Sequence, residues 1–376
     1  MLDWLQLMAD PLASPLQVWH DSLSDGTMHL QTWYIDTLKK LQDRIDLEVD
    51  ESEQVLQLIF EQKFSEIQIG ALLVALAAKG ESVNEIVGFV RAMRRFAVKL
   101  NHSQDRLVDT AGTGGDASGT FNISTAAAFV IAGAGIAVAK HGNRAMSGKC
   151  GSADVLSCLG VNIEAPAAVL EDCLSTCGIT FLFAPAFHPA MKTVGRVRKE
   201  LGIRTLFNVL GPLANPAGAR RQIIGVFSPH LTEILGDALL RLDCEHALVF
   251  SGEDGLDEIS LSARTRITEV QGGVARTTFV SPEDLGLGRS PRAAFLGGDV
   301  ECNAQLLRRI LSCQADGAQA DIVLLNAAAG IYVAGRASSL QQGLELARES
   351  LLTGKALEKL ELLVKRSNPL SVTRER

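Results

Sequence analysis

The chain has 376 residues, more than one hydrophobic core usually organises, so two domains are the first expectation. Hydrophobic residues make up 47% of it and charged residues 21%, an ordinary composition for a globular enzyme. The net charge of −7 argues against a nucleic-acid-binding protein, and the longest apolar run, residues 126–139, is too short to span a membrane.

The amino terminus has no basic flank followed by a long apolar core, so no secretion signal is predicted. The seven cysteines cannot all pair, and no two of them form a Cys-x-x-Cys arrangement. Free thiols in a reducing cytoplasm are the favoured interpretation. We therefore expect a cytoplasmic protein that binds neither nucleic acid nor membranes.

Residues 1–32 lack clean periodicity and are interpreted as an extension of unknown role, whereas the pattern from residue 33 to about 100 is helical. Ser-x-x-Gln at 65–68 and Ser-x-x-Glu at 82–85 are capping boxes, which begin helices, and Gly80 would end the helix between them. An all-helical lobe is predicted here, followed from residue 105 by alternating strands and helices.

The most informative segment runs from Asp109 to Thr125. Leu107 and Val108 are interpreted as the end of a buried strand and residues 126–131 as a helix, with four glycines between them. Glycine lets a ligand approach the backbone closely, and a helix N-terminus offers unpaired N–H groups at the positive end of its dipole. Together they predict a site for an anion such as phosphate or pyrophosphate.

This segment has other interpretations. Gly112-x-Gly114-x-x-Ala117 formally matches the dinucleotide-binding fingerprint, but the helix does not open directly after the glycines. The next strand, 136–139, also runs into Lys140 and not into an acid. No Gly-Lys-Ser/Thr follows, so the segment is not a P-loop. A glycine-rich turn without a ligand is the plain alternative.

The next strand leads into a second glycine-bearing loop, Lys140-His-Gly-Asn-Arg144, which continues through Lys149. Loops at the carboxyl ends of neighbouring parallel strands converge on one crevice. Lys140, Arg144 and Lys149 would therefore meet the amides of the first loop around one polyanion. A solvated basic loop is the alternative, and this loop alone would not exclude it.

A third element is acidic. Residues 248–250 are interpreted as a strand, and the turn Ser251 to Ile259 follows with adjacent carboxylates at Asp257 and Glu258. Mg²⁺ prefers oxygen ligands and is typically held by one or two carboxylates plus substrate phosphates. An acidic turn alone is more often a solvated loop, but beside the other two loops metal binding is favoured.

Further strands are expected at residues 180–183, 223–227 and 247–250, with helices at 321–334 and 340–352. The segment 185–216 is rich in proline, glycine, arginine and aromatic residues, and it interrupts the alternation of strands and helices.

In this order and spacing the motifs resemble the anthranilate phosphoribosyltransferase family, the tryptophan-pathway branch of a glycosyltransferase fold shared with pyrimidine nucleoside phosphorylases. The resemblance covers residues 33–366 and rests on Gly112-Thr-Gly-Gly-Asp116, Asn122-Ile-Ser-Thr125, Lys140-His-Gly-Asn-Arg144, Gly151-Ser-Ala-Asp154, Gly211-Pro-Leu-Ala-Asn-Pro216 and Asp254-Gly-Leu-Asp-Glu258. Ala145 and Gly148 stand where the family often has serine, so only backbone contacts are expected there.

The resemblance implies an α/β protein with a small all-helical lobe and a larger α/β lobe, whose central sheet is mostly parallel and flanked by helices. After the extension 1–32, the small lobe would comprise residues 33–103 joined by about 189–213. The large lobe would comprise 104–188 and 214–370. The ends of the interrupting segment would act as hinges, the active site would lie between the lobes, and the protein would be a homodimer.

The resemblance also implies the site residues. Contacts to 5-phosphoribosyl 1-pyrophosphate would come from Gly112, Gly115, Asp116, Thr120, Asn122, Ile123, Ser124, Thr125, Lys140, His141, Gly142, Asn143, Arg144, Ala145, Met146, Ser147, Gly148 and Ser152. Anthranilate would be bound by Gly112, Asn143 and Arg198, with Pro185 and His188 lining its approach. Two Mg²⁺ ions would be held by Ser124, Asp257 and Glu258.

The implied reaction joins the amine of anthranilate to C1 of the phosphoribosyl donor and releases pyrophosphate. No residue is assigned as general acid or base. His141 is the obvious candidate for a general base, but it is equally suited to shaping its loop and contacting the substrate. For the acceptor, Arg196, Lys199 and Arg204 are rivals of Arg198. A pyrimidine nucleoside phosphorylase-like enzyme and a non-catalytic nucleic-acid-binding relative are the alternative functions.

Overall fold

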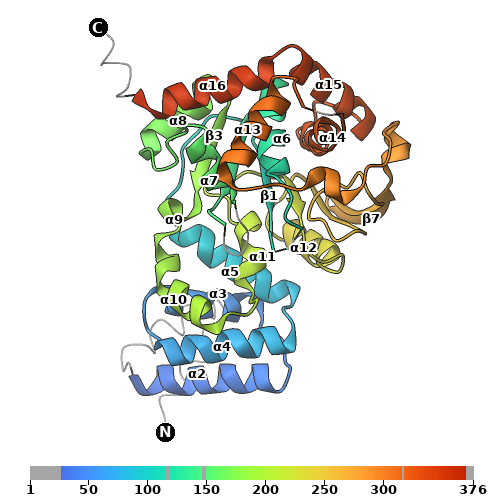
Figure 1. The fold of residues 1–376 in the computed structure, drawn as a ribbon. Helices are drawn as coiled ribbons and strands as arrows, with labels where there is room; N and C mark the ends of the chain where they lie inside the picture. Colours follow the sequence, from blue (N-terminus) through green and yellow to red (C-terminus); the bar gives the residue numbers. More distant parts are fainter. Residues whose placement is uncertain (1–26, 116–117, 146–149, 316, 370–376) are drawn as a thin grey trace.

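The computed structural model describes residues 27–115, 118–145, 150–315 and 317–369. A helical lobe lies below a larger α/β lobe in Figure 1. The prediction of a small helical lobe beside a larger α/β lobe with a mostly parallel sheet is therefore confirmed. Within the described residues, no helix is both long and apolar enough to cross a membrane.

The helical lobe begins with α2 (Thr27–Gln42), α3 (Val49–Phe60), α4 (Glu66–Lys79) and α5 (Val83–Phe96). Both predicted capping boxes are present, at Ser65 before α4 and Ser82 before α5, and Gly80 ends α4 at a φ of 89°. The chain later returns to this lobe through α10 (Lys192–Leu201) and α11 (Phe207–Leu210), and Figure 1 shows α10 beside α3 and α4. The helical part of the interrupting segment thus packs against α3 and α4.

The seven-stranded sheet has the order β3-β2-β1-β4-β5-β6-β7. Its first five strands in that order are parallel, and β6 and β7 are antiparallel additions. The strands are β1 (Val108–Gly112), β2 (Val138–Gly142), β3 (Ile179–Phe183), β4 (Arg221–Gly225), β5 (His246–Gly252), β6 (Thr265–Gln271) and β7 (Val274–Val280). The chain runs outward from β1 on one side and from β4 on the other, so the order reverses between these two strands.

The remaining helices cover the sheet and its ends. One face carries a thick layer of C-terminal helices packed on α6, whereas α12 packs across β5, β6 and β7 and also contacts α5 of the small lobe. These helices are α6 (Ile123–Gly133), α7 (Ser152–Cys158), α8 (Ala167–Cys177), α9 (Ala184–Phe187), α12 (Leu231–Leu240), α13 (Val300–Leu311), α14 (Gly317–Val333), α15 (Leu340–Leu352) and α16 (Lys355–Ser367). Short 3₁₀ turns lie at Pro189–Met191, Gly211–Leu213, Pro282–Leu285 and Arg292–Phe295.

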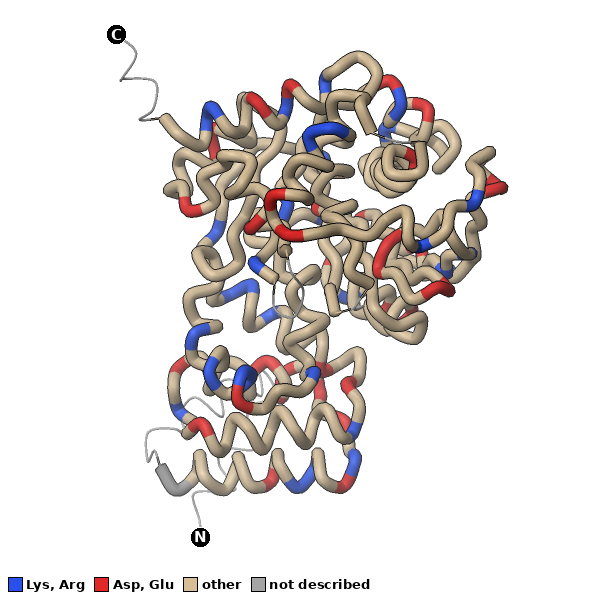
Figure 2. The backbone as a smooth tube through the Cα atoms, viewed as in Figure 1, with Lys and Arg blue, Asp and Glu red and all other residues tan. Residues whose placement is uncertain are grey.

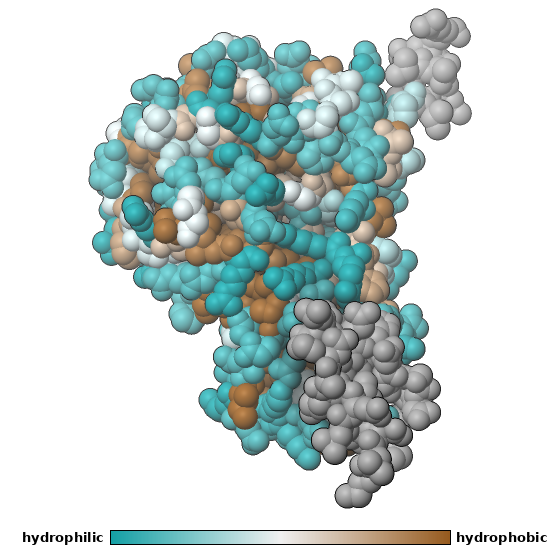
Figure 3. Space-filling view, turned by 180° about the vertical axis from the view of Figure 1, so that it is seen from behind, coloured by the Kyte–Doolittle hydropathy of each residue, from teal (hydrophilic) through white to brown (hydrophobic). Residues whose placement is uncertain are grey.

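Two main hydrophobic cores result. One lies between the sheet and the layer of α6 and α13 to α16. The other runs without a break from the helical lobe, through α11, to α12 and the opposite face of the sheet. Seen from behind in Figure 3, the surface is largely hydrophilic, with hydrophobic residues showing at the waist between the lobes. The lobes are therefore joined by packed apolar surface.

The strand predictions need correction. Leu107 and Val108 do not end the first strand, because Val108 begins β1 and the strand continues to Gly112 in parallel register with β4. The strand expected at 136–139 is instead Val138–Gly142, so Lys140 and His141 lie within it. The antiparallel strands β6 and β7 have no counterpart in the sequence predictions, although β-branched residues are frequent on both sides of a Gly272-Gly273 turn.

Candidate active site

The segment that carries Gly112, Gly114, Gly115 and Gly119, here called the glycine loop, leaves the carboxyl end of β1. The strand order reverses there, which is the usual place for ligands in open α/β sheets. Gly114 and Gly115 have φ values of 59° and 78°, a conformation that side chains with a Cβ rarely adopt. Thr113 donates its N–H to Gly225 O at the end of β4, at 2.8 Å. The loop is thereby fixed to the neighbouring strand.

The acidic turn after β5 reaches this same loop. Asp257 Oδ2 accepts the N–H of Gly114 at 3.0 Å, and Glu258 Oε1 accepts the N–H of Ser124 at 3.2 Å. The turn passes so close to the end of β4 that a Cβ on Gly225 would lie 1.7 Å from Asp257 O. The structure therefore brings together the two segments that the sequence predicted to share one ligand.

Lys140 is buried and does not lie in a solvated loop. Its Nζ donates to Thr110 O and, at 3.2 Å, to the hydroxyl oxygens of Thr110 and Ser124. Burial lowers the pKa of Lys140, while the nearby carboxylates of Asp109, Glu258 and Asp257 act in the opposite direction. Lys140 thus lies within electrostatic range of both carboxylates of the acidic turn.

On the other side of β1, Asp109 is fully buried and its Oδ1 accepts the N–H of His141 at 3.0 Å. Burial raises the pKa of Asp109 to about 6, although the His141 N–H and Lys140 oppose this shift. The carboxyl group thus ties β1 to β2, one residue before β2 ends at Gly142. Nothing in the sequence alone marked Asp109 as buried.

His141 and His188 face each other with ring centroids 5.1 Å apart. Burial lowers the pKa of His141 to about 3 and that of His188 to about 4. His141 Nδ1 lies 3.1 Å from Gly211 O, and a carbonyl can only accept, so Nδ1 carries the proton and Nε2 holds a lone pair. A neutral imidazole with such a low pKa is a poor proton acceptor for general-base catalysis.

The second loop is organised by Asp154 in the first turn of α7. Its carboxylate accepts from the N–H groups of Ala145 and Gly151 at 3.0 and 2.9 Å, and from Arg144 Nη1 at 2.9 Å. Against the effect of burial, these contacts hold the pKa of Asp154 below its usual value. Ser152 Oγ donates to Asn143 O at 3.3 Å, and the Asn143 side chain is exposed.

The side chains in the first turn of α6 differ in their exposure. Ser124 is half-buried and lies beside the acidic turn, whereas the side chains of Ile123 and Thr125 are almost fully buried. These two residues can therefore reach a ligand only through their backbone. Thr120 pairs its backbone with Leu296, and Asn122 directly precedes the helix. Four predicted contacts, Asp116, Met146, Ser147 and Gly148, lie outside the described residues, as does Lys149.

The arginines after the second loop occupy different environments. Arg198 lies on α10 with its guanidinium 5.2 Å from the ring centre of Phe207, and burial lowers its pKa. Arg196 is exposed and paired with Glu200. Arg204, considered only as a rival, donates from Nη2 to Gly115 O at 2.5 Å. Figure 2 shows basic residues along α10, which lies above α4 in the helical lobe.

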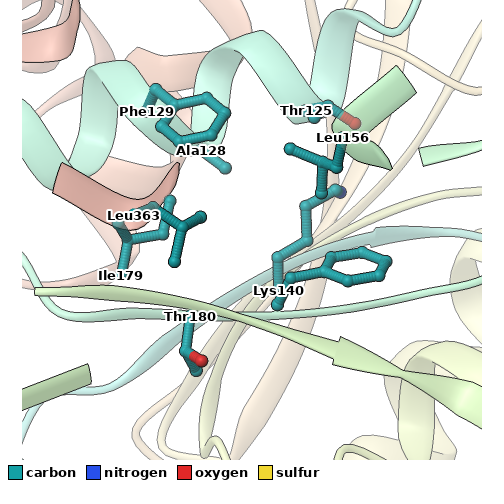
Figure 4. A pocket seen from close by; sticks show the side chains of 9 residues that line it. Thr125, Ala128, Phe129, Lys140, Leu156, Ile179, Thr180 and Leu363 are labelled. Carbon is teal, nitrogen blue, oxygen red and sulfur yellow. The ribbon is translucent and has the colours of Figure 1, made fainter. Parts of the chain in front are cut away.

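Two of the cavities lie outside the glycine loop and the acidic turn. Figure 4 shows the smaller, of about 10 Å³, beside the stem of Lys140 and lined mainly by apolar side chains such as Phe129, Leu156 and Ile179. The larger, of about 470 Å³, lies between the end of α5 and residues 215–218. Neither cavity is lined by the acidic turn or the glycine loop.

The donor atoms at the acidic turn suit a hard cation. Asp257 and Glu258 offer carboxylate oxygens and Ser124 a hydroxyl, the ligands that Mg²⁺ prefers. In the part of the chain that the structure describes, no group of three or more His, Cys, Asp or Glu side chains could hold a metal ion by itself. A cation here would complete its coordination with oxygens from water or a substrate.

Comparison with known proteins gives the class first. A model of the α/β domain of a glycosyl transferase family matches residues 104–357, and a model of that family's helical bundle domain matches residues 35–97. The chain belongs to this glycosyl transferase family, in agreement with its two-lobed fold.

The relatives narrow this class. Anthranilate phosphoribosyltransferases of Syntrophobacter fumaroxidans and Rubrobacter xylanophilus are each 49% identical to the chain, covering 89% of it and 98% of their own length. The solved structure of the Thermus thermophilus enzyme is 45% identical with a TM-score of 0.84, over 89% of this chain and 99% of that one. The chain is thus a member of the anthranilate phosphoribosyltransferase family, which confirms the resemblance and the enzyme class.

Proposed function

We propose that this protein transfers the phosphoribosyl group of 5-phosphoribosyl 1-pyrophosphate to the amine of anthranilate, releasing pyrophosphate, as a step of tryptophan biosynthesis. The contact that carries the proposal is the meeting of the acidic turn with the glycine loop and α6, through Asp257 and Gly114 and through Glu258 and Ser124. Cation ligands and phosphate-binding N–H groups then share one site.

Solved structures of the Saccharomyces cerevisiae enzyme support the choice of ligands. One is a complex with PRPP and Mg, 27% identical to this chain with a TM-score of 0.83 over 90% of it and 98% of that chain. Another, 26% identical, is a complex with 4-fluoroanthranilate. We extend these ligands to this chain and propose two Mg²⁺ ions per subunit, held by Ser124, Asp257 and Glu258.

The chemical problem of this reaction is charge separation. Breaking the bond at C1 develops positive charge on the ribose and negative charge on the leaving pyrophosphate. Mg²⁺, when bound, stabilises the leaving group. Phosphate oxygens would compete with Asp257 and Glu258 for the N–H groups of Gly114 and Ser124, which releases the carboxylates for the cation. The loop's preorganised N–H groups then require little rearrangement during reaction.

The acceptor amine is a weak nucleophile, so its orientation against C1 contributes heavily. We propose that Arg198 binds the anthranilate carboxylate, with Gly112 and Asn143 beside the two substrates and Pro185 and His188 along the approach. The low pKa of His141 supports a shaping role for it over that of a general base. For 5-phosphoribosyl 1-pyrophosphate we propose the same contact residues that the family resemblance implies.

We also propose the lobe boundaries given by the resemblance, with a homodimer in the cytoplasm. Free thiols are consistent with this location, and all seven cysteines of the chain are free in the structure. The size-exclusion mass of the purified protein tests the dimer directly, since a monomeric elution contradicts it.

Incubation of the purified protein with anthranilate, 5-phosphoribosyl 1-pyrophosphate and Mg²⁺ tests the function. We expect loss of anthranilate fluorescence with an equal release of pyrophosphate, and no reaction when the metal is chelated. Phosphorolysis of a pyrimidine nucleoside without Mg²⁺ would favour the phosphorylase alternative. A gel shift with single-stranded DNA would favour the nucleic-acid-binding one.

A further inference from the structure

Two buried asparagines on the C-terminal helices reach the loops of the site. Asn303 on α13 and Asn326 on α14 are 3% and 0% exposed. A buried amide must find partners for its oxygen and for both of its N–H donors, or its burial is costly. The partners of these two side chains lie mainly in the segments that carry the proposed site.

Asn326 clamps the residue that follows the acidic pair. Its Oδ1 accepts the N–H of Ile259 at 2.9 Å, and its Nδ2 donates to Ile259 O at 3.0 Å. Nδ2 also donates to Ile322 O, one turn earlier in α14, at 2.9 Å. Both backbone polar groups of Ile259 are therefore held by one rigid side chain, directly after Glu258.

Asn303 acts on the other half of the site. Its Oδ1 accepts the N–H of Gly298 at 2.8 Å, and its Nδ2 donates to Asn122 Oδ1 at 3.3 Å. Asn122 directly precedes α6, and its own Nδ2 donates to Cys150 O at 3.2 Å. Asn303 therefore supports the start of α6 and, through Asn122, the end of the second loop.

The segment around Gly298 also supports the glycine loop. Phe121 donates its N–H to Phe295 O at 3.0 Å, and Gly297 donates its N–H to Gly119 O at 2.8 Å. A Cβ on Gly297 would lie 2.7 Å from Asn303 Oδ1 and 2.9 Å from Phe121 N, so only glycine fits this close approach.

We propose that Asn326 and Asn303 are positioning residues, Asn326 for the carboxylates of Asp257 and Glu258 and Asn303 for the glycine loop and the start of α6. Neither residue is among the proposed substrate or metal contacts. The C-terminal layer of helices would thus set the geometry of the site from behind. This inference rests on the proposed function, because it assigns the acidic turn to Mg²⁺ and the glycine loop to the phosphoribosyl donor.

The two assignments give different kinetic signatures. Asn326→Ser removes the clamp on Ile259, so the Mg²⁺ concentration for half-maximal rate should rise about tenfold, the effect of losing roughly one net hydrogen bond. Excess Mg²⁺ should restore most of the rate. Asn303→Ser should raise the KM for 5-phosphoribosyl 1-pyrophosphate about tenfold at saturating Mg²⁺, and excess Mg²⁺ should not correct it. The KM for anthranilate should stay within about twofold in both.

Ser350→Ala is the matched control. Ser350 is buried on α15 and donates to Val130 O at 2.7 Å, so its loss removes a comparable bond from the same layer at the far end of α6. It should lower the melting temperature without either kinetic signature. If a serine variant does not fold, the aspartate variant at that position keeps the acceptor oxygen and is measured in its place.

The outcomes separate the inference from the function beneath it. A wild-type enzyme that works without Mg²⁺ would overturn the proposed metal site itself. A Mg²⁺-dependent wild type whose asparagine variants keep normal constants overturns only the positioning roles. Equal changes of all constants in both variants, or the same changes in Ser350→Ala, would reduce both asparagines to structural residues and overturn the proposal as well.

Discussion

Single side chains in this protein owe their chemistry to neighbours that are distant in sequence. Lys140 is held between the backbone of β1 and Ser124, and its charge faces the acidic turn more than a hundred residues later. Arg198 lies over Phe207 without a carboxylate partner among the described ion pairs, unlike Arg196. Burial without such a partner makes Arg198 the better candidate for binding a substrate carboxylate.

Arg198→Ala should raise the KM for anthranilate about 10- to 150-fold, because a charge-assisted hydrogen bond contributes about 1.5–3 kcal/mol. The KM for 5-phosphoribosyl 1-pyrophosphate should change little. Steady-state kinetics with each substrate varied in turn separates the two constants. Arg196→Ala, on the same helix but exposed and paired with Glu200, is the matched control. Equal losses for both substrates would contradict the assignment to the acceptor.

The buried histidines predict a pH dependence of stability. The folded-state pKa of His188 is about 4, below the unfolded value near 6.5, so its contribution is fully present above pH 6.5 and is lost as the pH falls toward 4. His141 acts in the same direction, down to about pH 3. Asp109, with its pKa raised to about 6, acts oppositely and is stabilising at the acidic side of that value.

The free energy of unfolding should therefore fall between pH 7.5 and 5, and His188→Gln should reduce that fall. Urea titrations of both proteins at the two pH values measure the difference. Exposed groups titrate alike in the two proteins and cancel. Parallel losses in wild type and variant would show that His188 does not contribute.

At the scale of elements, the candidate site is assembled from segments that follow the carboxyl ends of β1, β2, β3 and β5. The glycine loop depends on backbone conformation, since Gly114 has a positive φ and no neighbour within 4 Å of an added Cβ. Space is thus available at Gly114, whereas the conformation itself excludes a β-branched residue. The proposed role of the acidic turn depends instead on the negative charges of Asp257 and Glu258.

Gly114→Val should abolish binding of 5-phosphoribosyl 1-pyrophosphate and leave the fold largely intact, because valine resists the positive φ and obstructs the phosphate. Calorimetric titration measures the affinity. Gly135→Val is the matched control, because Gly135 also has a positive φ and open space but lies after α6, away from the loops. A folded Gly114→Val variant with normal affinity would show that the pyrophosphate binds elsewhere.

Replacing Asp257 and Glu258 by Asn and Gln keeps their size but removes two charges that a hard cation needs. Turnover should collapse or require far more Mg²⁺, with little loss of thermal stability. The rate is measured against Mg²⁺ concentration. Glu253→Gln is the control, an exposed carboxylate of the same turn that pairs with Arg264. An unchanged Mg²⁺ dependence in the double variant would leave the turn as a solvated loop.

At the scale of the whole molecule, the two lobes share one core. Buried residues of α5, α11 and α12 form a continuous cluster with the sheet. Arg94, near the end of α5, adds polar links by donating to Leu213 O at 2.9 Å and Leu242 O at 3.3 Å. The lobes are therefore expected to unfold together, with any hinge motion limited to small displacements.

Leu235→Ala on α12 tests this coupling. Leu235 is fully buried in the shared core, so its truncation should lower the free energy of unfolding by about 2–5 kcal/mol. Calorimetry should show one transition in both the wild type and the variant. Leu352→Ala, at a leucine that is 76% exposed, should change little. Two separate transitions would instead mean that the lobes are thermodynamically independent.

Several features of this protein could be predicted from short stretches of its sequence. The capping boxes at Ser65 and Ser82 predicted their helices, because a cap involves residues only three apart. The helix predicted at 340–352 is observed with the same bounds. The glycine loop and the adjacent carboxylates also indicate their ligands through short-range spacing, although their roles stay predictions.

Only the tertiary structure decided how these pieces meet. Asp257 reaches Gly114 across 143 positions of sequence, and Arg204 reaches Gly115 across 89. The burial of Lys140 and Asp109, and the clamp of Asn326 on Ile259, follow from strand order and helix packing that no local pattern encodes. Local propensity acts over a few residues, whereas contacts and pKa values depend on which distant segments exclude water from the same place.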